Sequence, residues 1–296
     1  MVFGIFPASG GLDGSAVESL STFESSILIA RNPGKLKHLE ARGATLRQAD
    51  SDESSMAYSV HKKAIDSAIK IKSGVKHILY TSLNFAGPAD STTSSAYGMQ
   101  AHVKTEAYLR QLHEEDPSFT FTLIREAQYS KSFPLYTSSW SFENPCSTIK
   151  IPHSGSLPGA SWAKQVKPMP NSSSKHIQRS ASFPTDFEYS NRTVLLTGPR
   201  EISLGGVVEI LARTSGTPVT IEEVSVEEFA NQESQQNGEG YGSGDFAKKW
   251  ATSFEGIKER SARIVTDDLE ELLGREPETF EVTVARMAKE AKEARK

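Results

Sequence analysis

The sequence has little cysteine, little excess charge and no long apolar run, and each shortage excludes a class of protein. Cys146 is the single cysteine among 296 residues, so neither an intramolecular disulfide nor a zinc site built from several cysteines can form. This cysteine usage is typical of a reducing compartment, and we expect a cytoplasmic protein. The 33 basic and 37 acidic residues give a net charge of -4, so the chain has no overall basic charge to attract nucleic acid or an anionic membrane.

The apolar segments are short. None approaches the roughly 20 apolar residues that a membrane-spanning helix needs. The apolar run at the N-terminus is interrupted by Pro7, Gly10 and Asp13, and no basic stretch precedes it, so we expect no signal peptide. With 37% hydrophobic and 24% charged residues, the composition is that of a folded chain.

Apolar runs alternate with segments of helical periodicity over the first part of the chain. We expect strands at residues 2–6, 27–30, 45–48, 76–80 and 120–124, and helices at 53–72 and 96–112. Strands that alternate with helices in this way predict a doubly wound parallel sheet, which is an α/β fold of the Rossmann type.

The texture of the sequence changes near residue 150. Residues 154–184 are rich in Ser, Pro and Lys and show little apolar periodicity. Order is expected to resume with strands at 193–196 and 219–222, a helix at 204–212 and a charged amphipathic helix at 278–296. We therefore predict a Rossmann domain over 1–150, an irregular loop over 151–190, and a small C-terminal α+β lobe over 191–296 that interleaves with the Rossmann domain.

A turn of small residues follows the first predicted strand. Its residues are Pro7, Ala8, Ser9, Gly10, Gly11 and Leu12. Small side chains let backbone N–H groups approach a pyrophosphate, which then lies at the N-terminus of the following helix. The turn therefore predicts a dinucleotide site, and an ordinary tight turn between strand and helix is the alternative.

The end of the second predicted strand indicates which dinucleotide fits. An acidic residue there would bond the ribose 2′-hydroxyl, whereas an arginine accommodates a 2′-phosphate. The chain has Arg31 at this position, with Asn32 and Lys35 nearby, and Asp50 after the third strand as a further cofactor contact. NADP(H) is therefore favoured over NAD(H), and a solvated surface arginine is the alternative.

Several stretches resemble the NmrA-like family of atypical short-chain dehydrogenases, in particular its fungal oxidoreductases. The residues that carry the resemblance are GIFPASGG from Gly4, IARNPGKL from Ile29, GVKHILYTSL from Gly74, MQAH from Met99 with Thr105 and Glu106, LIRE from Leu123 and LLTGP from Leu195. The resemblance implies an NADP(H)-binding Rossmann domain with a smaller substrate lobe. It implies reduction of a small carbonyl, quinone or enone in a fungal secondary metabolic pathway. Other members bind the nucleotide only as a signal, which implies a protein partner and no turnover.

The chain departs from the family pattern at three places. Asp13 stands where the family's turn has a glycine, and it puts a carboxylate beside the expected pyrophosphate. Residues 51–59 leave no room for a strand that relatives carry there, so we expect a sheet one strand short, with residues 76–80 paired beside the first strand. The stretch after Trp162 also differs from the helical segment of relatives. A degenerate protein without affinity for the nucleotide is therefore a third interpretation.

The Tyr-x-x-x-Lys pair of short-chain dehydrogenases does not occur at the expected place. The helix there begins near Tyr97, and the residue four positions later is Ala101. Tyr58 and Lys62 have the right spacing, but they follow the third strand instead of a later one. We therefore interpret this match as chance.

Other candidates lie where predicted strands end, since ligands of open α/β sheets bind at the carboxyl ends of strands. Thr81 and Ser82 are expected beside the nicotinamide, and His102, Lys104 and Tyr129 are the catalytic candidates. The resemblance puts His102 where some relatives present a substrate-facing residue, and Lys104 would supply positive charge to an enolate-like oxygen. A packed or surface histidine is the alternative for His102. We expect no metal.

Overall fold

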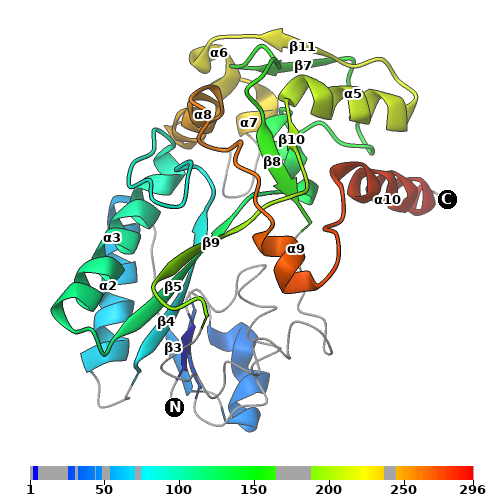
Figure 1. The fold of residues 1–296 in the computed structure, drawn as a ribbon. Coiled ribbons are helices and arrows are strands. Elements are labelled where there is room, and N and C mark those ends of the chain that lie inside the picture. The colour runs from blue at the N-terminus through cyan, green and yellow to red at the C-terminus, as the bar shows by residue number, and fades with distance from the viewer. Residues whose placement is uncertain are drawn as a thin grey trace. The chain divides into compact units, whose positions relative to one another are not determined.

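The chain forms two compact units whose segments interleave along the sequence (Figure 1). The structure is a computed structural model, and it describes residues 3–5, 26–30, 33–43, 45–48, 54–70, 75–164, 188–236 and 245–295. The first unit takes in Met1–Ser82, Ala101–Ile124 and Val166–Val194. The second takes in Leu83–Gln100, Arg125–Gln165 and Leu195–Lys296.

The first unit begins with three parallel strands. They are β1 (Phe3–Ile5), β2 (Ser26–Ala30) and β3 (Thr45–Gln48), in the order β1-β2-β3. The register places Ile5 opposite Leu28, and Leu28 opposite Leu46. The 3-10 helix η1 (Pro33–Arg42) follows β2, and α2 (Ser54–Lys70) follows β3. Parallel strands alternating with helices are the arrangement that the sequence predicts.

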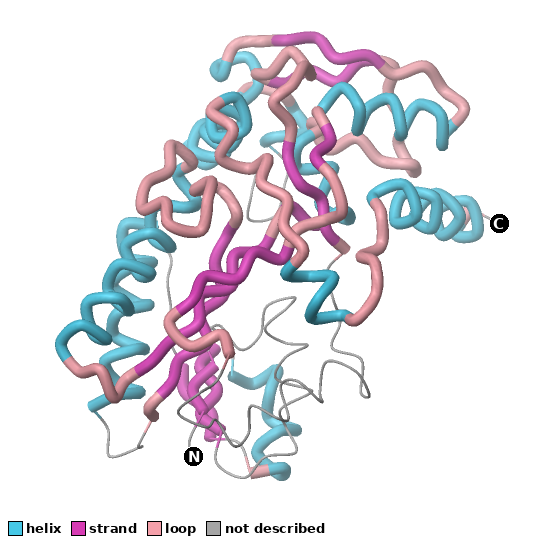
Figure 2. Tube along the Cα trace, viewed as in Figure 1, coloured by secondary structure: helices cyan, strands magenta, loops and turns pink. Residues whose placement is uncertain are grey.

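A further sheet has the order β4-β5-β9. Its strands are β4 (His77–Leu83), β5 (Thr120–Glu126) and β9 (Arg192–Leu196). The short η2 (Tyr97–Met99) and α3 (Gln100–Glu115) connect β4 to β5, and α2 and α3 lie side by side along these strands (Figure 2). The helices and the strands pack together through one hydrophobic core, made of Ile65, Val75, Ile78, Tyr80, Leu109, Phe119, Phe121 and Leu123.

The predicted pairing of residues 76–80 beside the first strand is not what the structure shows. Within the described part of the chain, β4 has β5 as its only neighbour and β1 has only β2. The described residues of β1 and β4 therefore belong to different sheets. The described part of β1 is Phe3–Ile5, and three residues offer few backbone groups for the hydrogen bonds of a further strand pair.

The second unit mixes short strands with helices. A sheet of order β10-β8-β6 contains β6 (Gln128–Tyr129), β8 (Ala160–Ala163) and β10 (Glu201–Ile202), while β7 (Thr148–Ile151) pairs in parallel with β11 (Thr220–Glu223). The helices are η3 (Ser130–Tyr136), α5 (Leu204–Ser215), α6 (Val226–Ala230), α7 (Glu233–Gln236), α8 (Asp245–Lys258), α9 (Asp268–Leu273) and α10 (Phe280–Ala294). This unit extends beyond the α+β lobe predicted over 191–296, because it also takes in Leu83–Gln100 and Arg125–Gln165.

Local sequence signals fix the ends of the longer helices in this lobe. Ser203 and Thr279 precede α5 and α10, and their side chains accept hydrogen bonds from the backbone N–H groups of Gly206 and Val282. Gly216 ends α5 at φ 72°, in the left-handed region that a glycine adopts without strain. None of the helices in the described ranges combines the length and apolar character that a bilayer crossing requires.

Aromatic side chains form the core of the second unit. Phe133, Trp140, Trp162 and Phe280 are almost fully buried. The Trp162 ring lies 5.2 Å from Tyr136 in an edge-to-face arrangement and 5.2 Å from Phe280. Such pairs contribute about 0.5–1.5 kcal/mol beyond their buried area, so β8 is packed between η3 and α10.

β8 lies within the segment 151–190, where the sequence predicts an irregular loop. All four of its residues are buried, and a strand covered on both faces shows no alternation of polar and apolar residues. Periodicity therefore gives no signal for this strand. Residues 165–187 of the same segment lie outside the described residues.

Candidate functional site

The strand ends that would frame a dinucleotide are formed in the first unit. Because β1 and β2 are parallel neighbours, their carboxyl ends lie beside each other at one edge of the sheet, where open α/β sheets bind ligands. The predicted contacts Pro7, Ala8, Ser9, Gly10, Gly11, Leu12, Arg31, Asn32 and Asp50 lie outside the described residues. Lys35 lies within η1, where the structure describes its backbone but not its side chain. These contacts stay predictions.

Ser82 lies near the end of β4 and faces α3. Its hydroxyl donates a hydrogen bond to Glu106 Oε1 at 2.6 Å, and both residues are 2% exposed. Thr81 is half-buried and, as the adjacent strand residue, points to the opposite face of the sheet. The structure therefore gives Ser82 a partner within the protein, and the expected nicotinamide contacts of both residues stay predictions.

His102 belongs to a polar cluster between β4, α2 and α3, which we call the His61–Tyr80–His102 cluster. Tyr80 Oη lies 2.8 Å from His102 Nδ1 and 3.1 Å from His61 Nδ1. Thr105 Oγ1 donates to the Ala101 carbonyl at 2.8 Å, and it lies 3.0 Å from His61 Nδ1. Because the Thr105 hydroxyl hydrogen is used on Ala101, Thr105 Oγ1 accepts from His61 Nδ1, and Tyr80 Oη shares hydrogen bonds with both imidazoles.

Burial sets the charge state of this cluster. It lowers the pKa of His61 to about 4. Burial, together with the nearby His61, lowers the pKa of His102 to about 3. Both rings are neutral at physiological pH and bind a further proton only at lower pH, so His102 holds no imidazolium proton to donate.

The other two catalytic candidates lie in different surroundings. Lys104 is exposed on α3, and residues two apart in a helix do not face the same side, so it points away from His102. Tyr129 is half-buried in β6 of the second unit, where it pairs with Ala163 of β8. The three assignments stay predictions.

The side chain of Lys62 is engaged between α2 and α3. Its ammonium donates to Asp66 at 2.9 Å and to the Tyr108 hydroxyl at 3.0 Å, and it lies 4.2 Å from the centre of the Tyr108 ring. These contacts join two helices. They give Lys62 a structural role, in agreement with the interpretation of the Tyr58 and Lys62 spacing as chance.

Sequence reasoning missed a group of side chains in the second unit. Among the residues that the structure describes, both amide atoms of Asn84 and Gln128, the Ser130 hydroxyl and the Trp162 indole N–H are buried without a hydrogen-bond partner. The four residues, which we call the free polar set, are 0%, 5%, 0% and 1% exposed, respectively. Gln128 and Ser130 flank the predicted Tyr129, but single Asn, Gln or Ser residues carry no sequence signal of burial.

Backbone contacts and strand pairing link the members of the free polar set. The backbone N–H of Asn84 donates to the Glu126 carbonyl at 2.8 Å. Gln128 follows two residues later and is the register partner of Trp162 in the parallel β6–β8 pair. Ser130 then begins η3. Asn84, Gln128 and Ser130 therefore follow the ends of β4 and β5 along the chain, and Trp162 lies on the neighbouring β8.

Arg125 stabilises the loop that follows β4. Its guanidinium is fully buried and donates to the carbonyls of Pro88 at 2.8 Å and Ser91 at 2.7 Å. Charged donors on carbonyl oxygens form the stronger class of hydrogen bond. Arg125 therefore holds the segment that carries Asn84.

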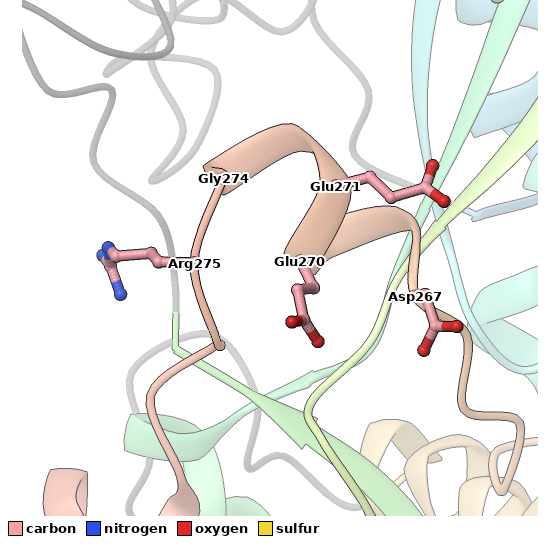
Figure 3. Close-up of a pocket in the computed structure, with 5 residues that line it drawn as sticks. All are labelled: Asp267, Glu270, Glu271, Gly274 and Arg275. Carbon is pink, nitrogen blue, oxygen red and sulfur yellow. The ribbon is translucent and has the colours of Figure 1, made fainter.

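Figure 3 shows a surface hollow at α9 lined by Asp267, Glu270, Glu271, Gly274 and Arg275. The three carboxylates point in different directions, and Arg275 turns away from them. Over the described ranges, no group of three or more His, Cys, Asp or Glu side chains could hold a metal ion. We assign no ligand to this hollow.

Comparison with known proteins gives two curated relatives, and no family model matches the chain. The chain is 26% identical over 297 aligned residues to the NmrA-like family domain-containing oxidoreductase flvB of Aspergillus flavus. The alignment covers 91% of this chain and 89% of that protein. It is 31% identical over 150 residues to quinone oxidoreductase 2 of Escherichia coli, covering 43% of this chain and 48% of that protein. The predicted resemblance to NmrA-like oxidoreductases is confirmed.

Solved structures share the fold over almost the whole chain. The NADPH complex of the E. coli quinone oxidoreductase QOR2 has a TM-score of 0.67 at 22% identity and covers 97% of this chain and 99% of that one. Citrobacter sp. triphenylmethane reductase with NADP(H) has a TM-score of 0.67 at 20% identity, covering 97% and 100%. The transcriptional regulator NmrA with NADP has a TM-score of 0.62 at 14% identity, covering 99% and 96%. The predicted Rossmann-type α/β fold is confirmed.

Proposed function

We propose that this protein, which is similar to an NmrA-like oxidoreductase over nine-tenths of its length, is an NADP(H)-dependent reductase of small carbonyl, quinone or enone compounds. The observation that carries the proposal is the match to a quinone oxidoreductase in both sequence and fold. The parallel β1 and β2, which end at one edge of their sheet, support nucleotide binding there.

The proposed reaction takes a hydride from NADPH and a proton from solvent. For a quinone, quinone, NADPH and one proton give hydroquinone and NADP+. In this proposal Arg31 binds the 2′-phosphate, and the small-residue turn from Pro7 to Leu12 approaches the pyrophosphate. The second unit receives the acceptor. The cytoplasmic location that the single cysteine favours is part of the same proposal.

A second candidate function is nucleotide sensing without turnover. The sequence has no Tyr-x-x-x-Lys pair on the helix that follows Ser82, and the fold is shared with a regulator that binds NADP. In this case the nucleotide binds, and a protein partner reads its redox state. The two candidates differ in whether bound NADPH is oxidised.

Nucleotide titration followed by an acceptor test separates the candidates. We expect calorimetry to show tighter binding of NADPH than of NADH, and Arg31→Ala to remove the difference. We expect Asp13→Gly to tighten both nucleotides, because it removes a carboxylate beside the pyrophosphate. Loss of NADPH absorbance on adding naphthoquinone supports the reductase, and binding without oxidation supports the sensor. No binding of either nucleotide contradicts both.

A further inference from the structure

We propose that the loop of residues 154–159, which we call the His153 loop, is an acid-sensitive switch in the second unit. Protonation of His153 breaks the hydrogen bond that holds this loop against the start of α5, and the loop opens. All of its parts lie in the second unit, and the switch operates without a nucleotide or an acceptor. It therefore goes beyond the proposed reaction.

The His153 ring is buried directly before the loop, with one nitrogen bonded and the other without a partner. The residue is 2% exposed, and its Nδ1 accepts a hydrogen bond from the Gly155 N–H at 2.9 Å. Since Nδ1 is the acceptor, the hydrogen of the neutral ring is on Nε2. Nε2 has no hydrogen-bond partner among the described residues. The ring is therefore held in one tautomer by its hydrogen bond to the loop.

Gly155 connects the loop to two neighbouring elements. Its carbonyl accepts from the Gly205 N–H at 2.7 Å. Gly205 lies in the first turn of α5, where backbone N–H groups have no partner within the helix. Gly155 has φ 85°, and a Cβ there would lie 2.6 Å from Ile221 Cδ1 of β11 and 3.2 Å from Gly205 N. The Gly155 backbone therefore packs directly on α5 and β11, and its N–H is oriented by His153.

A second proton on the ring is incompatible with the closed loop. In the imidazolium both nitrogens carry a hydrogen, so the Nδ1 hydrogen would face the Gly155 N–H across a nitrogen–nitrogen distance of 2.9 Å. Two donors at this distance repel each other and form no hydrogen bond, so Gly155 must move. Its carbonyl then leaves the Gly205 N–H as well, and the loop separates from α5.

The rest of the loop offers little resistance to this movement. Leu157, in its middle, is 70% exposed, so its side chain does little to hold the loop closed. At the far end, the Gly159 N–H donates to Glu201 Oε1 at 2.7 Å, and this bond does not involve the ring. Opening therefore begins at Gly155 and is limited to the residues before Gly159.

Charged side chains from two elements act on the ring. Burial and the ammonium of Lys258 on α8 lower the pKa of His153 below its ordinary 6.5, while Glu223 of β11 and Glu255 of α8 oppose this change. Lys258 lies 3.2 Å from Glu255 and 3.8 Å from Glu223, so the three charges partly cancel. The closed loop therefore excludes the proton at neutral pH and admits it only below pH 6.5.

The other charged groups on the elements around the loop have partners of their own. Lys150 of β7 lies 3.2 Å from Glu222 and 3.6 Å from Glu228. The first turn of α5 carries no acidic side chain. His153 is therefore the group whose titration the loop should follow.

The direction of the pH effect follows from the lowered pKa. In the open loop the ring is no longer bonded to Gly155, and its pKa returns toward 6.5. The closed loop is fully favoured above that pH. Below it, the ratio of open to closed loop rises by up to about tenfold per pH unit, until the pH reaches the pKa of the closed form.

Hydrogen exchange of backbone amides at pH 7.5 and pH 5.5 tests the switch, with each rate divided by that of an unfolded peptide at the same pH. We expect the protection of the Gly155 and Gly205 amides to be about tenfold lower at pH 5.5. The Val224 N–H, which donates to the Ile151 carbonyl at 3.0 Å, should keep its protection. It therefore reports whether the unit as a whole stays folded.

His153→Asn is the matched control variant. An asparagine side-chain oxygen accepts a hydrogen bond from the backbone N–H two residues later, and it does not titrate. The variant should keep the protection of Gly155 equal at both pH values. Lys258→Met removes a positive charge that opposes protonation, so an NMR titration of the His153 ring should give a higher pKa than in the wild type. This second variant tests the switch even if His153→Asn does not fold.

Several results would overturn the proposal. One is equal protection of Gly155 at both pH values in the wild type. Another is a pH response in His153→Asn equal to that of the wild type, since another group would then be titrating. A loss of protection at Val224 as large as that at Gly155 would show that the whole unit unfolds and that the loop does not open by itself. An unchanged or lower pKa of His153 in Lys258→Met would contradict the described surroundings of the ring.

Discussion

Tyr80 Oη and His102 Nδ1 share a hydrogen bond of 2.8 Å across the contact between β4 and α3. The bond joins residues 22 positions apart and engages a histidine that the sequence analysis assigns to catalysis. It also makes two imidazoles and a phenol part of the packing of the first unit. The acid stability of the fold therefore depends on these rings.

Lowering the pH should destabilise the protein before its carboxylates titrate. The pKa of His61 is lowered to about 4 and that of His102 to about 3 from the ordinary 6.5. The unfolded chain therefore takes up protons near pH 6.5 that the folded protein refuses. Each neutral ring therefore stabilises the fold fully above pH 6.5. The free energy of unfolding falls as the pH drops toward 4, by up to about 1.4 kcal/mol per pH unit for each ring.

Urea unfolding at pH 7.5 and pH 5.0 measures this effect. His77, whose pKa burial lowers to about 4, should add to it in the same direction. The double variant His61→Gln and His102→Gln serves as the control and should show a smaller difference between the two pH values. Equal stability of the wild type at both pH values would show that the rings are not buried in the neutral form.

Removing the Tyr80 hydroxyl should destabilise the first unit. Tyr80→Phe removes the 2.8 Å hydrogen-bond partner of His102 Nδ1 and the 3.1 Å partner of His61 Nδ1. A buried group deprived of its partner costs about 1–3 kcal/mol. Tyr108→Phe is a matched control, because that hydroxyl bonds Asp66 and Lys62 near the surface, where such contacts contribute less. A loss of unfolding free energy as small as that of Tyr108→Phe would contradict the geometry.

The sequence predicted the first unit well because its elements are long enough to show a period. The helix expected at 53–72 is α2 (Ser54–Lys70), and the strand expected at 120–124 is β5 (Thr120–Glu126). The short strands of the second unit have two to four residues, too few for a pattern to appear. Their pairing depends on tertiary contacts of Trp162 and Phe280.

The candidate site was harder to predict for a different reason. Polar residues such as Gln128 are usually exposed, and only the packing of β6 against β8 shows that it is buried and unpaired. His102 was found from its position in a resembling stretch, but its contacts to Tyr80 and toward His61 come from different elements of the fold. Sequence spacing cannot supply contacts of that kind.

The Ser82–Glu106 bond should show strong coupling in a double-mutant cycle. The Ser82 hydroxyl donates to Glu106 Oε1 at 2.6 Å where both residues are buried, and a buried polar group that loses its partner costs about 1–3 kcal/mol. We expect Ser82→Ala to lower the free energy of unfolding by about 2 kcal/mol, and by less in a Glu106→Gln background. Additive effects of the two substitutions in urea unfolding would contradict a direct bond.

The close approach of Gly198 to β8 should tolerate no side chain. A Cβ at this position would lie 1.8 Å from the Trp162 carbonyl oxygen, and this atom belongs to the backbone, so no rotamer change relieves the overlap. Gly198→Ala should therefore displace β8 and lower the melting temperature by several degrees. Gly98→Ala is the matched control, because a Cβ there has no neighbour within 4 Å, and it should leave the melting temperature unchanged or raise it slightly. Equal melting temperatures for the two variants would show that β8 and the loop of Gly198 are not packed as described.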